Sequence, residues 1–103
     1  MAEYHKITQE EAKARMDSGD APVVLDVREP SEYEEEHIPG AVLLPLGSVA
    51  DEAADKLPDK NQEILVYCRS GMRSEMAAKK LVAQGYTAVY DFGGIMSWPY
   101  ETE

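Results

Sequence analysis

The chain of 103 residues is long enough for one compact domain and too short for two independent hydrophobic cores. Hydrophobic residues make up 44% of it and charged residues 29%, a composition typical of a globular domain and not of a disordered chain. Twenty acidic residues against ten Lys and Arg give a formal net charge of -10, which argues against nucleic acid and anionic membranes as partners.

Apolar runs rich in β-branched residues alternate along the chain with segments of helical periodicity. In chain order the predicted elements are a weak strand at 4–7, a helix that ends by Gly19, a strand at 22–27, a short helix, a strand at 41–44, a helix at 48–57, a strand at 63–67, a helix at 73–84 and a strand at 87–90. Parallel neighbours need long crossover connections, so this alternation predicts a mostly parallel sheet covered by helices on both faces. In such sheets ligands bind at the carboxyl ends of the strands.

Capping residues define several of the helix ends. Thr8 with Glu11, and Ser31 with Glu34, have the spacing of a capping box, in which each side chain binds the backbone N–H of the other residue. Gly85 suits the left-handed residue that closes the helix before it. We expect one domain over residues 1–103, present as a monomer, with an ordered core from about residue 4 to about residue 100.

Hydropathy and cysteine content narrow the class of protein. No stretch approaches the roughly 20 apolar residues that a membrane-spanning helix needs, and residues 1–11 lack the basic start and apolar run of a signal peptide. We therefore expect a cytoplasmic protein without membrane contact. One cysteine and two distant histidines allow no internal disulfide and show no zinc-ligand spacing, so we expect no metal site.

The segment from Cys68 to Ser74 lies between a predicted strand and a predicted helix, where backbone N–H groups can converge on an anion. Gly71 provides the freedom that a tight curl requires. The helix N-terminus, Arg69 and Arg73 favour a thiolate, so we predict that Cys68 is largely ionised at neutral pH and is the catalytic nucleophile. The predicted substrate-binding residues are Arg69, Ser70, Gly71, Met72, Arg73 and Ser74.

A lone cysteine at a strand end is more often an inert part of the core. Here the strand end, the two arginines, the glycine and the following helix together favour a reactive Cys68. No histidine lies near it in the sequence to act as a base, so a cysteine-protease arrangement is not indicated.

Three blocks of the sequence resemble the rhodanese family. The first runs from Leu25 to Tyr33 and continues from His37 to Ala41, the second is the loop from Cys68 to Ser74, and the third, from Gly93 to Trp98, is similar to the double glycine and tryptophan after the last strand. The resemblance implies an α/β rhodanese-like fold, a five-stranded parallel sheet flanked by helices on both faces. It places the cysteine loop at the carboxyl end of the central strand.

The resemblance also implies an activity. A thiosulfate sulfurtransferase of this type moves a sulfane sulfur from thiosulfate or a persulfide to cyanide, a small thiol or a protein thiol such as a thioredoxin-like protein. The sulfur passes through a persulfide on Cys68, and the mechanism requires no metal or organic cofactor. The alternatives are a persulfide carrier in a protein relay and a non-catalytic interaction module, a role in which such domains often serve when the cysteine is lost. Cdc25-type phosphatases and arsenate reductases are a weaker alternative, because they have one residue more than the four between Cys68 and Arg73.

Residues outside the loop receive structural interpretations. Asp26 and Arg28 end an apolar strand near the expected active face, and we expect them to brace the loop by charge-assisted hydrogen bonds rather than to react. His37 is expected to be a hydrogen-bonded loop residue and Trp98 to fill an edge of the core. The acidic runs at 32–36 and 51–55 are expected to be solvated, with recruitment of a basic protein as the alternative.

Overall fold

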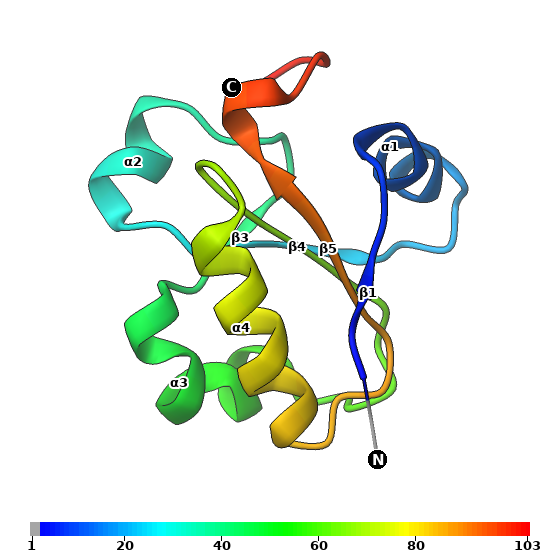
Figure 1. Cartoon of the computed structure of the whole chain (residues 1–103), viewed down its shortest axis with the longest axis vertical. Helices are drawn as coiled ribbons and strands as arrows, with labels where there is room; N and C mark the ends of the chain where they lie inside the picture. Colours follow the sequence, from blue (N-terminus) through cyan, green and yellow to red (C-terminus); the bar gives the residue numbers. More distant parts are fainter. Residues whose placement is uncertain (1–2) are drawn as a thin grey trace.

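The computed structural model describes residues 3–103, and its central feature is a five-stranded parallel sheet (Figure 1). Every hydrogen-bonded pair of neighbouring strands is parallel, and β4 occupies the centre of the order β1-β5-β4-β2-β3. The predicted sheet is thereby confirmed. The strands are β1 (His5–Lys6), β2 (Val23–Asp26), β3 (Val42–Leu43), β4 (Ile64–Cys68) and β5 (Val89–Gly94).

Helices cover both faces of this sheet, as Figure 1 shows. Two helices, α3 and α4, pack on one face, and α1 packs on the other together with the segments around Ile38 and Trp98. No helix among residues 3–103 is long and apolar enough to cross a bilayer. The helices are α1 (Gln9–Asp17), α2 (Pro30–Glu35), α3 (Val49–Lys56) and α4 (Met72–Ala83), with short 3-10 turns at Leu46–Ser48 and Ile95–Ser97.

The side chains of β4 alternate between the two faces. Ile64, Val66 and Cys68 belong to the buried cluster beneath α3 and α4, whereas Leu65 and Tyr67 belong to the cluster beneath α1. All five are buried, as a strand covered on both faces requires. The period of two therefore directs Cys68 toward the side of α4 and Tyr67 toward the opposite side.

The caps of the first and last helices are as predicted. The Glu11 N–H donates to the Thr8 hydroxyl at 3.0 Å, and the Thr8 N–H donates to the Glu11 carboxylate at 3.4 Å. Gly85 follows α4 with a φ of 100°, which an L side chain rarely adopts.

The start of α2 differs from the prediction. The helix begins at Pro30, and the Glu29 N–H donates to the Glu32 carboxylate at 2.9 Å, so the box is formed by Glu29 and Glu32 and not by Ser31 and Glu34. Proline explains the shift, because its fixed φ and missing N–H suit the first helical position. The consequence is that Glu32, in the first turn, is held in one orientation.

The last strand also extends beyond the predicted 87–90. It continues through the double glycine, because Gly94 pairs with Cys68 across the sheet. A Cβ on Gly94 would overlap the backbone carbonyl of Arg69. The absence of a side chain at Gly94 therefore lets β5 run directly against the loop that follows Cys68.

Candidate active site

Cys68 ends β4, and its sulfur lies under the first turn of α4. Only 1% of the residue is exposed, and it belongs to the buried cluster beneath α3 and α4. Its Sγ has a polar partner as well, because the Gly71 N–H donates to it at 3.0 Å. Gly71 itself has a φ of 115° and forms the N-cap of α4. Of the loop N–H groups expected to converge on the sulfur, that of Gly71 makes this contact.

Ser74 and Asp91 tie the loop to β5. The Ser74 hydroxyl, fully buried, donates to the Asp91 carboxylate at 2.7 Å and lies 3.0 Å from the Gly71 carbonyl. The same carboxylate accepts the Gly93 N–H at 3.0 Å. The Ser74 side chain therefore holds the loop in place, and substrate binding by its N–H stays a prediction. Asp91 was missed by sequence reasoning, because an isolated Asp inside an apolar strand gives no sign of which loop it reaches.

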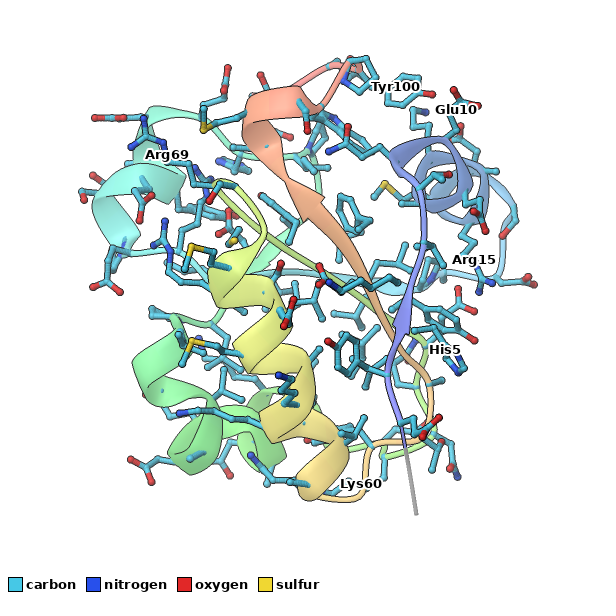
Figure 2. The ribbon with its side chains drawn as sticks, in the orientation of Figure 1. His5, Glu10, Arg15, Lys60, Arg69 and Tyr100 are labelled. Carbon is cyan, nitrogen blue, oxygen red and sulfur yellow. The ribbon has the colours of Figure 1, made fainter. Side chains whose placement is uncertain are left out.

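The outer rim of the site consists of Arg69, Ser70 and Met72, all exposed. Met72 is 78% exposed, and its predicted contact with a substrate stays a prediction. Arg69 lies beside α2, as Figure 2 shows, and lines a hollow there with Met96. The Arg69 carbonyl accepts the Met96 N–H at 3.1 Å, so the segment after β5 forms one wall of the mouth.

Arg73 does not face the mouth alone, because it forms an ion pair with Glu32 of α2. Its two terminal nitrogens donate to the two carboxylate oxygens of Glu32 at 2.7 Å and 2.9 Å. The hydrogen bond from Arg73 lowers the pKa of Glu32 to about 2, and it is also the main cause that raises the pKa of Arg73. The sequence predicts that Arg73 binds the substrate, but it does not indicate Glu32 as a partner, because Glu32 lies 41 positions away.

Asp26 and Arg28 form a buried ion pair that includes Tyr67. An Nη of Arg28 donates to the Asp26 carboxylate at 2.7 Å, and the Tyr67 hydroxyl donates to the same oxygen at 2.6 Å. Burial, and next the hydrogen bond to Asp26, raise the pKa of Tyr67. Arg28 also donates to the Glu36 carbonyl and Tyr67 accepts the Ile38 N–H, so the pair fixes the chain on both sides of the turn after α2.

The hydrogen bonds of Asp26 and Arg28 hold Tyr67 and the segment after α2, and none of those described reaches the cysteine loop directly, so bracing of the loop by these two residues stays a prediction. Their link to the loop runs through Tyr67, which precedes Cys68 in β4. The contribution of Tyr67 was missed, because a tyrosine in an apolar run reads as a core residue until its hydroxyl has a partner.

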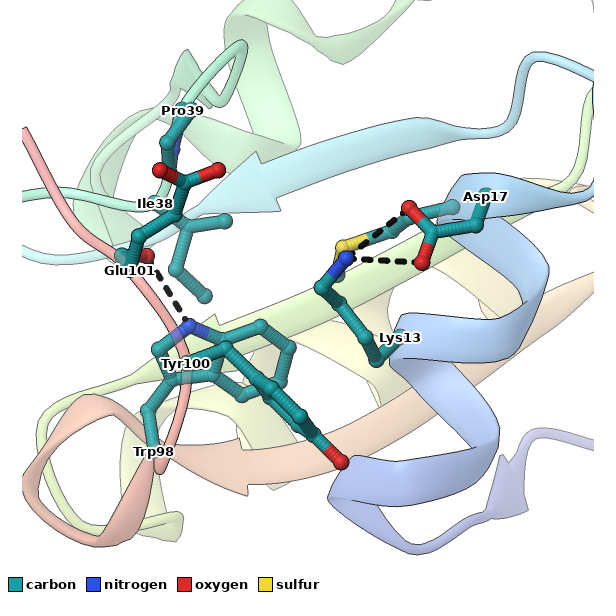
Figure 3. A pocket seen from close by; sticks show the side chains of 8 residues that line it. Lys13, Asp17, Ile38, Pro39, Trp98, Tyr100 and Glu101 are labelled. Carbon is teal, nitrogen blue, oxygen red and sulfur yellow. Dashed lines mark hydrogen bonds and ion pairs between the residues drawn. The ribbon is translucent and has the colours of Figure 1, made fainter.

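His37 and Trp98 have the structural roles expected of them. The His37 ring stacks on Tyr33 with centroids 3.9 Å apart, and its Nδ1 lies 2.8 Å from the Tyr33 carbonyl. Trp98 packs against Phe92 and Tyr100, and its indole N–H donates to the Glu101 carbonyl. The hollow beside Trp98 shown in Figure 3 includes no residue of the cysteine loop, and we do not place the site there.

Comparisons with known proteins agree with the motifs and the fold. The family model of the rhodanese-like domain matches residues 8–100. The putative sulfur carrier protein YrkF of Bacillus subtilis is 43% identical over 99 residues, which cover 95% of this chain and 52% of that protein. The chain thus spans about half the length of that relative.

Two further matches span nearly the whole of the similar protein. The thiosulfate sulfurtransferase GlpE of Pseudomonas syringae is 37% identical over 107 residues, covering 99% of this chain and 97% of that protein. A solved structure described as a rhodanese with anions from E. coli has a TM-score of 0.75 and 37% identity, covering 81% of this chain and 98% of that one. The chain belongs to the rhodanese-like domain family, and its relatives support a rhodanese-type sulfurtransferase.

Proposed function

We propose that Cys68 takes a sulfane sulfur from thiosulfate or a persulfide and passes it to cyanide, a small thiol or a protein thiol. The observation that carries the proposal is the contact between the Cys68 sulfur and the Gly71 N–H at the N-terminus of α4. A backbone donor and the positive end of a helix stabilise an anionic sulfur without a separate base.

The first half-reaction forms a persulfide. The Cys68 thiolate attacks the outer sulfur of thiosulfate, whose S–S bond breaks with both electrons leaving on sulfite. A new S–S bond joins the transferred sulfur to Cys68, and the negative charge of the thiolate passes to the transferred sulfur, which is now the terminal one. The Gly71 N–H and the guanidinium groups of Arg69 and Arg73 stabilise the charge that develops on the leaving group.

The second half-reaction returns the enzyme to its first state. The acceptor attacks the terminal sulfur and binds it. The product is thiocyanate when the acceptor is cyanide, and a persulfide of the acceptor when the acceptor is a thiol. The S–S bond to Cys68 breaks, and its electrons restore the thiolate. No electron enters or leaves the system, so neither half-reaction needs an external oxidant or reductant.

The burial of Cys68 favours small donors in the first step. A donor has to pass the rim of exposed loop residues to reach a sulfur on a residue that is 1% exposed. Once loaded, the side chain is longer by one S–S bond of about 2 Å. We expect the terminal sulfur to be more accessible to a larger acceptor than the Cys68 sulfur itself.

A persulfide carrier in a protein relay is the second candidate. The name of the similar B. subtilis protein, a putative sulfur carrier, favours it. An enzyme turns over quickly with thiosulfate and a small acceptor, whereas a carrier exchanges sulfur mainly with protein persulfides and protein thiols. Rates measured with both kinds of donor and acceptor separate the two.

Release of sulfite from thiosulfate in the presence of cyanide tests the proposal. We expect steady release by the wild-type protein, with thiocyanate formed in equal amount, and none by Cys68→Ser. Sulfite release by Cys68→Ser at the wild-type rate would refute a persulfide on this residue. Hydrolysis of an aryl phosphate, which the shorter loop disfavours, would instead support the phosphatase alternative.

A further inference from the structure

The ion pair between Glu32 and Arg73 joins the first turn of α2 to the first turn of α4. Glu32 is fixed from two directions, because one carboxylate oxygen accepts both the Glu29 N–H at 2.9 Å and an Arg73 N–H at 2.7 Å. The other oxygen accepts from Arg73 at 2.9 Å. Both side chains are about one-quarter to one-third exposed, so the pair stands at the edge of the site and is not part of the core.

This pair changes the charge that an incoming donor meets. Arg69 and Arg73 would together present two positive charges beside Cys68, but Glu32 brings a negative charge onto the second of them. The sulfur of Cys68 is close enough to Arg73 to contribute to the raised pKa of its guanidinium. Because its pKa is lowered to about 2, the carboxylate of Glu32 is ionised at neutral pH.

Charge compensation of this kind acts most strongly on donors of high charge. The attraction or repulsion between a donor and a fixed charge is proportional to the charge of the donor. Thiosulfate carries two negative charges and releases sulfite, which is also an anion. The persulfide of an uncharged small thiol carries one negative charge at most.

We propose that Glu32, by pairing with Arg73, sets the donor preference of the Cys68 site toward persulfides of low charge and away from thiosulfate. This inference rests on the proposed sulfurtransferase function and adds to it a class of donor. Glu32 acts through Arg73 and touches no reacting atom, so it is a specificity-determining residue and not a catalytic one.

The Glu32→Gln variant tests the inference. Glutamine retains the length of the side chain and the N3 position of a capping box, so α2 keeps its start while the charge is removed. The readout is the ratio of kcat/KM for thiosulfate to kcat/KM for the persulfide of 2-mercaptoethanol, with cyanide as the acceptor. We expect this ratio to rise on the order of tenfold.

Three further variants separate charge from fold. Glu34→Gln makes the same change of net charge on the exposed side of α2 and should leave the ratio unchanged. Glu32→Asp keeps the charge and should stay closer to the wild-type ratio than Glu32→Gln does. Arg73→Gln removes the cation itself and should lower the ratio below the wild-type value, which checks that Arg73 attracts the doubly charged donor.

The possible results separate a failure of the inference about Glu32 from a failure of the proposed sulfurtransferase function. A fall in the ratio for Glu32→Gln would show that Glu32 helps thiosulfate by holding Arg73 in place, and it would overturn the inference alone. An equal rise for Glu34→Gln would show a general effect of net charge and would overturn it too. If neither donor loads wild-type Cys68, the proposed function and the inference fail together.

Discussion

The buried ion pair at the end of β2 connects the stability of the fold to the geometry of the site. Asp26 is fully buried and Arg28 is 4% exposed, and each is the other's ionic partner. Asp26→Asn keeps the shape of the side chain and leaves the Arg28 charge buried without a counter-charge. Breaking a buried pair in this way costs about 3 kcal/mol. Since small domains have a total stability of about 5–15 kcal/mol, the loss is large.

Urea unfolding followed by circular dichroism measures this loss. We expect the midpoint to fall with an unchanged slope, because the surface exposed on unfolding is the same. For a domain of this size the thermal midpoint should fall by on the order of 10–20 °C. Arg28→Met removes the cation instead and should also destabilise, because it leaves the carboxylate of Asp26 buried.

The double variant Asp26→Asn with Arg28→Met provides the control. With no charge left unpaired, it should lose clearly less stability than the sum of the two single variants. A loss for Asp26→Asn within about 0.5 kcal/mol of zero, typical of a surface site, would contradict the reasoning. So would strict additivity of the two single losses, because it would show that the charges do not depend on each other.

Three other predictions concern the loop and its supports. Gly94→Ala should reduce sulfite release more than tenfold and cost about 2 kcal/mol of unfolding free energy, because its Cβ would overlap the loop backbone; Gly47→Ala, at an uncrowded position, should do neither. Ser74→Ala should cost about 1–2 kcal/mol in urea unfolding, since it leaves a buried carboxylate short of one donor, and a neutral result would refute its bracing role. The pKa of Glu32 falls on folding from 4.5 to about 2. The ionised Glu32 therefore stabilises the folded protein fully above pH 4.5, and this stabilisation is lost as the pH drops toward 2. The advantage of the wild-type protein over Glu32→Gln in unfolding free energy, about 1 kcal/mol at pH 7, should therefore shrink below pH 4.5, and a constant advantage from pH 7 to 3 would contradict it.

The strands and most helices could be predicted because each depends on nearby residues. The apolar run of β4, the Thr8 box and Gly85 are local signals, and the alternation of elements leads to a parallel sheet. The capping box of α2 was misplaced because two overlapping patterns occur within six residues, and Pro30 decides between them. The end of β5 was missed because its pairing with Cys68 depends on a residue far away in the sequence.

In the candidate site, too, the features that depend on nearby residues could be predicted and the contacts between distant residues could not. The cysteine, the glycine and the arginines form one continuous segment, so the loop was found as a unit, and the structure directs the sulfur toward it. The partners that hold this segment come from other elements. Glu32 reaches Arg73 from α2, and Asp91 reaches Ser74 from β5, and only the folded chain brings these residues together.

The mass of the intact protein after incubation with thiosulfate tests the account most directly. Under non-reducing conditions we expect the wild-type mass to increase by one sulfur atom, the increase to disappear when cyanide is added, and Cys68→Ser to stay unmodified. An unchanged wild-type mass with thiosulfate and with a small persulfide, or an added sulfur on Cys68→Ser, would contradict the claim that Cys68 carries the transferred sulfur.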